Sequence, residues 1–432
     1  MKTEMKLTMI KTRKISSQAY GRHQLLQVTY PQAPEYLSTT LKAIMQKTVS
    51  LLPTFTFGHF CIDFGPCATW LIAPAIAVAM DLSPAELGLL ITLYSMGSAL
   101  AFFPAGLMAD HISNRGILLI ATFWWVVAGF ILASFAPGYW SLIILLALAG
   151  LGDAAWHPVA TGVLVQENPK NKARALGTHA MGGSFAEVIA PLAAGFVLAY
   201  VDWRTALQLS VLPTLFMGVF FLRIVRHVPR GSGTRVSLAD LASIWQTWKN
   251  PAGLRVILMV STYNMAMMAL LSMVPLYMQR TYDLNTAKTG LIFSAMLLVG
   301  ALAQPLVGHI SDRIGRRPIA LWGNLLAAIS AGIAFFALSL PYFVIVILIS
   351  ITIMVSIRSV LLVTAVEHAG KKESTTLGLT FALMDGIGAA GALLAGIAGT
   401  YQLEYVFLMA AVLSFCAFAT TLLSPKIKVQ DA

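Results

Sequence analysis

The sequence predicts an all-α membrane protein in which twelve transmembrane helices form two pseudo-symmetric six-helix bundles. Three observations predict this fold. First, 58% of the 432 residues are hydrophobic and only 11% are charged, against about 25% charged residues in a typical soluble domain. Second, apolar runs long enough to cross a bilayer recur along the chain. Third, the two halves of the sequence align with one another at a fixed shift.

The composition excludes several classes of protein. The mean hydropathy is +0.77, and a soluble chain of this length has too little polar surface to cover so much apolar surface. An ordinary soluble enzyme and a disordered chain are therefore excluded. The sequence has no nucleotide-binding loop, nucleophile motif or metal-ligand spacing. We expect no catalytic residues, no bound metal and no cofactor, with a proton gradient as the source of energy.

The candidate spans follow from the length of each apolar run, since a helix needs about 20 apolar residues to cross the hydrocarbon core. In the first half they are 52–79, 87–109, 117–136, 140–165, 176–200 and 204–222. In the second half they are 254–279, 287–308, 318–340, 342–366, 376–400 and 404–424. The domains expected from these runs are a basic tail 1–50, a first bundle 51–222, a linker 223–252, a second bundle 253–424 and a tail 425–432.

The positive residues give the orientation. The net charge of +11 would favour a nucleic-acid partner in a soluble protein, but here the Lys and Arg residues gather in alternate loops. If the N-terminus is cytoplasmic, all but four of the 29 Lys and Arg residues lie on the cytoplasmic side; the four are Arg204, Arg280, Lys288 and Arg358. This segregation is the positive-inside pattern. It predicts an integral protein of a bacterial inner membrane with both termini cytoplasmic, in contact with lipid, without nucleic acid and monomeric.

The halves repeat one another. A shift of 201–202 residues places Asp81–Gly88 over Asp283–Gly290 and Asp63 over Asn264. Each half thus has six spans, with polar and glycine residues at matching positions. Membrane transporters are commonly built from such repeats, with the solute site between the halves near the middle of the membrane.

One loop of each half carries a recognisable motif. Gly308–Arg317 reads GHISDRIGRR, and its first-half copy Gly106–Arg115 reads GLMADHISNR, so that the second glycine of the motif is replaced by Ser113. This loop resembles the signature loop of the major facilitator superfamily, and the resemblance implies a cytoplasmic gate that is remade in each transport cycle. The gate residues that it implies are Gly106, Asp110, Arg115, Gly308, Asp312, Arg313, Gly315, Arg316 and Arg317.

Three shorter segments resemble particular branches of this superfamily. His59–Asp63 in the first span and Gly150–Pro158 in the fourth are similar to the fosmidomycin-resistance type of drug exporter within this superfamily. Gly182–Gly195 in the fifth span is similar to the Gly/Pro-rich segment of drug/proton antiporters, with Glu187 in its middle. The resemblance implies efflux by antiport with protons.

Ionisable residues inside a span are costly and are therefore functional candidates. The seven that we single out for proton coupling or substrate binding are His59, Asp63, Asp153, His157, Glu187, Arg358 and Asp385. At 1.5 Å per residue they fall in one broad layer near the middle of the membrane. They cannot all be charged and unpaired. Arg358 is expected to pair with one acid, Asp385 among them, or to hold an anionic group of the substrate.

These residues predict a secondary active transporter that moves a small organic solute by alternating access, driven by protons and directed outward. One alternative is a proton-coupled importer of a metabolite or siderophore-like ligand. Another, of a different class, is a non-transporting membrane receptor or scaffold on the same fold, which would have no need of charges inside its spans.

Overall fold

The computed structural model describes residues 51–169, 171–231, 246, 248–369 and 373–423. The predicted tails 1–50 and 425–432 and half of the predicted linker 223–252 (residues 232–245 and 247) lie outside the described residues. For Asp110 only the backbone is described.

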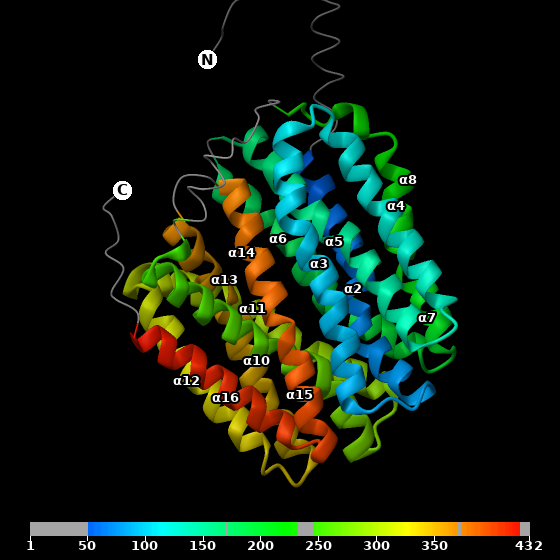
Figure 1. The fold of residues 1–432 in the computed structure, drawn as a ribbon, viewed down its shortest axis with the longest axis vertical. Helices are drawn as coiled ribbons and strands as arrows, with labels where there is room; N and C mark the ends of the chain where they lie inside the picture. Colours follow the sequence, from blue (N-terminus) through cyan, green and yellow to red (C-terminus); the bar gives the residue numbers. More distant parts are fainter. Residues whose placement is uncertain (1–50, 170, 232–245, 247, 370–372, 424–432) are drawn as a thin grey trace, which may run out of the picture. The chain divides into compact units, whose positions relative to one another are not determined.

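The first six spans form the N-terminal bundle (Figure 1). Its helices are α2 (Leu51–Ala79), α3 (Pro84–His111), α4 (Arg115–Ser134), α5 (Tyr139–Glu167), α6 (Lys172–Val197), α7 (Trp203–Ser210) and α8 (Leu212–Phe221). A 3-10 turn, η1, follows at Val225–His227.

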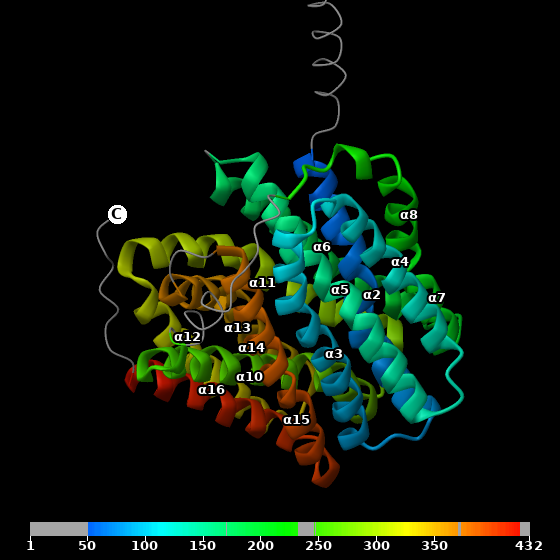
Figure 2. The same cartoon turned by 45° about the horizontal axis from the view of Figure 1, so that its top comes forward.

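The last six spans form the C-terminal bundle, whose α14 and α15 lie beside α3 in both ribbon views (Figures 1 and 2). Its helices are α10 (Pro251–Tyr282), α11 (Thr286–Ile314), α12 (Arg316–Ala334), α13 (Leu340–Ala369), α14 (Glu373–Gly388), α15 (Ala390–Tyr401) and α16 (Tyr405–Leu423). Among the described residues twelve helical stretches are long and apolar enough to cross a membrane, as the sequence predicted.

Two predicted spans are broken. The sixth is interrupted at Val211 between α7 and α8, where Pro213 lies in the first turn of α8 and has no N–H to donate to the preceding turn. The eleventh is interrupted at Ala389 between α14 and α15, in a stretch rich in glycine. The length of the apolar runs predicted neither break, because hydropathy does not register a single interrupted turn.

The repeat is visible in the turns. Asp81 and Asp283 are equivalent in the two halves, and both have a φ of 52°, in the left-handed region. The next helix in each half is capped two residues later, by Ser83 before α3 and Asn285 before α11. Asp202 caps α7 in the same way, and its hydrogen bond from the backbone N–H of Thr205 lowers the pKa of its carboxyl.

Two seams join the bundles at the ends of the spans opposite the motif loops. Helix α14 also packs on α3 nearer the motif loops, where the rings of Phe102 and Phe381 stack with centroids 5.5 Å apart. In the α3/α15 seam a Cβ at Gly88 would overlap the carbonyl oxygen of Ala392. In the α6/α11 seam a Cβ at Gly195 would lie 2.9 Å from the Cα of Gly290. Gly88 and Gly290 are equivalent in the repeat, so the seams are related by the same pseudo-symmetry as the helices. Glycine lets the two backbones touch.

The seams differ in one polar contact. Thr92 of α3 donates its hydroxyl to the carbonyl of Ala389 (2.7 Å) and accepts from the N–H of Leu393 (3.1 Å), which satisfies the backbone at the break before α15. Its repeat equivalent, Ser294 of α11, is buried, and its Oγ has no hydrogen-bond partner among the described residues. Only the α3/α15 seam therefore carries this bridge within the described chain.

We expect Thr92→Val to weaken the α3/α15 seam, because valine keeps the shape of threonine but can neither donate to Ala389 nor accept from Leu393. The N–H of Leu393 would lose its partner, whereas the carbonyl of Ala389 would keep the N–H of Ala392, and the cost is about 1–3 kcal/mol. Thermal unfolding in detergent should show a lower transition temperature. Ser294→Ala is the matched control, and an equal fall in both variants would contradict the capping role.

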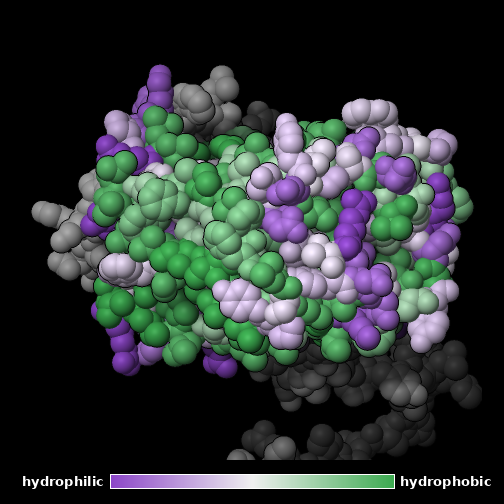
Figure 3. All heavy atoms as spheres, turned by 90° about the horizontal axis from the view of Figure 1, so that it is seen from below, coloured by the Kyte–Doolittle hydropathy of each residue, from purple (hydrophilic) through white to green (hydrophobic). Residues whose placement is uncertain are grey.

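Large apolar side chains cover much of the outside. Leu100, Leu302 and Phe336 are each about 70% exposed (71%, 71% and 69%). Viewed from below, apolar side chains gather on one part of the face, and polar and apolar ones are mixed on the rest (Figure 3). So much exposed apolar surface needs lipid as its solvent, and the chain is an integral membrane protein.

Candidate functional site

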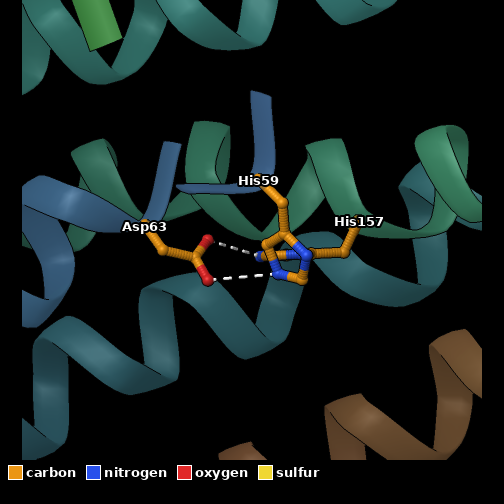
Figure 4. Close-up of side chains that lie close together, drawn as sticks. All are labelled: His59, Asp63 and His157. Atoms are coloured by element: carbon orange, nitrogen blue, oxygen red, sulfur yellow. Dashed lines mark ion pairs between the residues drawn. The ribbon is translucent and has the colours of Figure 1, made fainter. Parts of the chain in front are cut away.

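A cluster of four ionisable side chains lies inside the N-terminal bundle. His59 and Asp63 come from α2, and Asp153 and His157 from α5, each pair one helical turn apart. The Nε2 of His59 lies 3.2 Å from Oδ2 of Asp63, and the Nε2 of His157 lies 3.5 Å from Oδ1 of the same carboxylate (Figure 4). Asp153 is looser, with its Oδ1 3.9 Å from the Nε2 of His157.

Helix α6 fixes the orientation of the first ring. The Nδ1 of His59 lies 2.9 Å from the carbonyl oxygen of His179, and the two imidazoles stack with centroids 4.4 Å apart. Gly183 leaves room for this arrangement, because a Cβ there would lie 2.6 Å from the Nε2 of His59. The carbonyl accepts from Nδ1, so Nε2 is the ring atom turned to Asp63.

This geometry requires a hydrogen atom or a metal ion between each imidazole Nε2 and Asp63. A nitrogen lone pair facing a carboxylate is repulsive, so the ring must either donate an N–H to the carboxylate or share a metal ion with it. The side chains of His59, Asp63 and His157 are only 14–19% exposed. Among the described residues these three also form the one group whose ligand atoms, all within 4.8 Å of one another, could hold a metal ion.

A second contact joins the two bundles. Arg358 of α13 donates from Nη1 to Oε1 of Glu187 of α6, at 2.5 Å. The sequence left the partner of Arg358 open between Asp385 and other acids, and the structure gives Glu187 of the opposite bundle. The two side chains are 38% and 30% exposed, more than the N-terminal cluster.

Asp385 of α14 makes a different contact. Its Oδ1 accepts from the amide of Asn264 on α10, at 3.2 Å, and that amide also donates to the carbonyl of Met384 at 3.0 Å. Asn264 is the repeat equivalent of Asp63. Each bundle thus places a polar side chain of its first helix beside its fifth span.

The structure therefore divides the seven predicted residues into three groups: the four-residue cluster of α2 and α5, the Glu187–Arg358 pair, and Asp385 with Asn264. Sequence reasoning missed Asn264, whose neutral side chain draws no attention in a search for charges. Its alignment with Asp63 was the signal that could have found it. Thr92 gave no signal, since hydroxyl side chains are common inside spans.

The predicted gate residues lie at the ends of α3, α4, α11 and α12. Arg115 is buried and donates to the carbonyl of Ala109 and to the side chain of Gln166. Arg316 pairs with Asp312 at 2.9 Å and with Glu367 at 2.8 Å. The contacts of Arg115 lie within the N-terminal bundle and those of Arg316 within the C-terminal bundle, so neither set joins the two bundles.

The remaining gate residues differ between the copies. Gly315 has a φ of 93°, which favours glycine, whereas Ser113 at the equivalent place has no positive φ. The second glycine of the motif is therefore required only in the second half. Arg317 donates to the carbonyl of Leu422 at 2.8 Å, and Gly106 is buried in α3. Gly308 is partly buried in α11 with no atom within 4 Å of where a Cβ would lie, and Arg313 is exposed near the end of α11.

Similar proteins are transporters. A 4-methylmuconolactone transporter (probable) of Cupriavidus pinatubonensis is 27% identical over 261 residues, which are 57% of this chain and 59% of that protein, so the chain spans less than two thirds of it. The fosmidomycin resistance protein of Escherichia coli is 24% identical over 397 residues, 89% of this chain and 95% of that protein.

The fold is also found in solved structures. A bacterial homologue of the human lysosomal transporter Spinster, in an inward-facing and unoccupied conformation, matches with a TM-score of 0.73 and 16% identity, over 91% of this chain and 97% of that one. The nucleoside transporter NupG matches with a TM-score of 0.70 and 13% identity, over 86% and 98%. The family model of the Major Facilitator Superfamily matches residues 55–392 and 287–430. This chain belongs to the Major Facilitator Superfamily of membrane transporters.

Proposed function

We propose that this transporter exports a small organic solute in exchange for protons, by alternating access across a bacterial inner membrane, as a monomer with both termini in the cytoplasm. The observation that carries the proposal is the Glu187–Arg358 ion pair. Its partners belong to different bundles, so any motion that separates the bundles at this depth must break it.

A proton on Glu187 allows this ion pair to separate. Arginine keeps its charge in proteins, so the proton must go to the acid. An ionised Glu187 left without its partner in a medium of low polarity is unfavourable, whereas a protonated Glu187 is neutral and free to separate. Proton binding to Glu187 therefore releases Arg358, which becomes available to a polar or anionic group of the solute. We assign the coupling proton to Glu187 for this reason.

The other residues of the layer have supporting roles in this proposal. The cluster of His59, Asp63, Asp153 and His157 supplies polar groups on the N-terminal side of the pathway, and Asp385 with Asn264 supplies them on the C-terminal side. The motif loops around Arg115 and Arg316 rearrange when the gate on their side closes. The seams of α3/α15 and α6/α11 form the gate on the other side, and they open in the second half of the cycle.

Glu187→Gln is expected to separate proton coupling from transport. Glutamine mimics the protonated acid, so the variant should still exchange solute across vesicles but should lose at least tenfold of the accumulation driven by an acid interior. The measurement uses purified protein in proteoliposomes, with fosmidomycin, 4-methylmuconolactone and a sugar as probes, because relatives carry these names. Glu167→Gln, at the exposed end of α5, is the control.

Each other outcome decides an alternative. Gradient-driven accumulation that survives in Glu187→Gln would overturn the assignment of the proton. Solute that accumulates only in vesicles with an alkaline interior would identify an importer. A folded protein that moves none of the probes and no proton would support a receptor or scaffold.

A further inference from the structure

We infer that His59, Asp63 and His157 bind a divalent transition-metal ion of the zinc type inside the N-terminal bundle. The nitrogen and oxygen ligands of zinc lie about 2.0–2.2 Å from the ion in a tetrahedral site, which puts neighbouring ligand atoms about 3.3–3.6 Å apart. The Nε2 of His59 lies 3.2 Å from Oδ2 of Asp63 and the Nε2 of His157 lies 3.5 Å from its Oδ1, and one ligand atom from each of the three residues lies within 4.8 Å of the other two. In Figure 4 the carboxylate and both rings point toward one another.

The surroundings orient one ligand, His59, as metal sites do. A metal-bound histidine usually donates its second ring N–H to a carbonyl or carboxylate, which fixes the tautomer. The Nδ1 of His59 has such a partner in the carbonyl of His179, at 2.9 Å. The Nε2 lone pair is thereby directed to the space shared with Asp63 and His157.

The cluster also holds buried oxygen atoms without partners. Oδ1 of Asp63 and Oδ1 of Asp153 have no hydrogen-bond partner among the described residues. A cation between the rings would satisfy Asp63 Oδ1. Asp153, 3.9 Å from the Nε2 of His157, lies close enough to move in as a fourth ligand or to hold a bound water. Two imidazoles with a carboxylate favour zinc, cobalt or nickel over magnesium or calcium.

The repeat confines this site to one bundle. The residues equivalent to His59, Asp63 and His157 in the second half are Val260, Asn264 and Arg358, which offer no set of metal ligands. All three ligands come from α2 and α5, so a bound ion would join two helices of the same bundle. It would therefore remain bound while the bundles move relative to one another.

The test is a Co²⁺ titration of the untagged, purified protein, followed by its visible absorption. We expect the intense bands of tetrahedral cobalt, saturation at about one ion per chain, and displacement by Zn²⁺. His59→Gln, Asp63→Asn and His157→Gln should each weaken binding at least tenfold. His227→Gln, which removes an exposed imidazole in η1, should bind as the wild type does.

Folding and transport are separated from binding in this design. Zn²⁺ should raise the thermal unfolding temperature of the wild type and of His227→Gln, but not of a ligand variant that retains its helical circular dichroism. Equal binding by the wild type and all three ligand variants would place the ion elsewhere and overturn the inference. A folded wild type that shows no cobalt bands would also overturn the inference. Neither result bears on the coupling role of Glu187, which is measured without added metal.

Discussion

Gly88→Ala is expected to reduce transport at least tenfold. Alanine is the better helix former by about 1 kcal/mol, so α3 itself should not be weakened. The added Cβ would overlap the carbonyl oxygen of Ala392, a backbone atom that cannot move without moving α15. The bundles can then no longer approach at the α3/α15 seam, and the protein is held in the state that is open on that side.

Rates of solute exchange in proteoliposomes measure this effect. Variants of two other glycines test whether the loss depends on how close the added Cβ lies to its neighbours. A Cβ at Gly290, the repeat equivalent, would lie 3.0 Å from Pro191 O and Gly195 Cα, so Gly290→Ala should have a smaller effect. Gly332→Ala, whose Cβ would meet only Ala411 Cβ at 3.7 Å, should transport normally. Equal losses in all three variants would mean that seam contact does not limit the cycle.

Arg358→Gln should lower both transport and stability, because it leaves the Glu187 carboxylate in the membrane without its cation. Loss of one partner of a fully buried pair costs about 3–5 kcal/mol, and we expect about 1–2 kcal/mol here because both side chains are partly exposed. Thermal unfolding in detergent and exchange in vesicles measure the two losses. Arg223→Gln, an exposed arginine after α8, is the control.

The double variant Glu187→Gln/Arg358→Gln distinguishes the ion pair from other roles of Arg358. If the stability loss comes from the stranded carboxylate, removing both charges should restore the unfolding temperature to near that of the wild type. Coupling should remain lost, because neither the acid nor the cation is present. A double variant as unstable as Arg358→Gln alone would show that Arg358 stabilises the bundle by other contacts.

Most of the fold could be predicted because its signals are local or periodic. Apolar runs gave twelve spans, and the 202-residue shift gave equivalent turns at Asp81 and Asp283. The breaks at Val211 and Ala389 were missed because hydropathy does not register a single interrupted turn, and the hydroxyl of Thr92 that bonds the backbone at the second break comes from a distant helix. Thr92 and Ala389 are almost 300 residues apart, and no pattern along the chain connects them.

The candidate site was predicted as a layer but not as contacts. The i,i+4 spacing placed His59 beside Asp63 and Asp153 beside His157, and these pairs hold. The contact of Asp63 with His157 depends on how α2 packs on α5, and that of Glu187 with Arg358 depends on how the bundles face one another. Spacing within a helix carries no information about either, so the sequence alone does not distinguish Asp385 from Glu187 as the partner of Arg358.

The most direct test of alternating access is the distance between spin labels at Tyr200 and Lys288, on opposite sides of the α6/α11 seam, in protein without its native cysteines. Both positions are exposed. We predict two distance populations in the wild type. In Gly88→Ala the longer one should dominate, because rigid bundles that cannot close one seam cannot close the other. A single distance that is the same in both proteins would contradict the account.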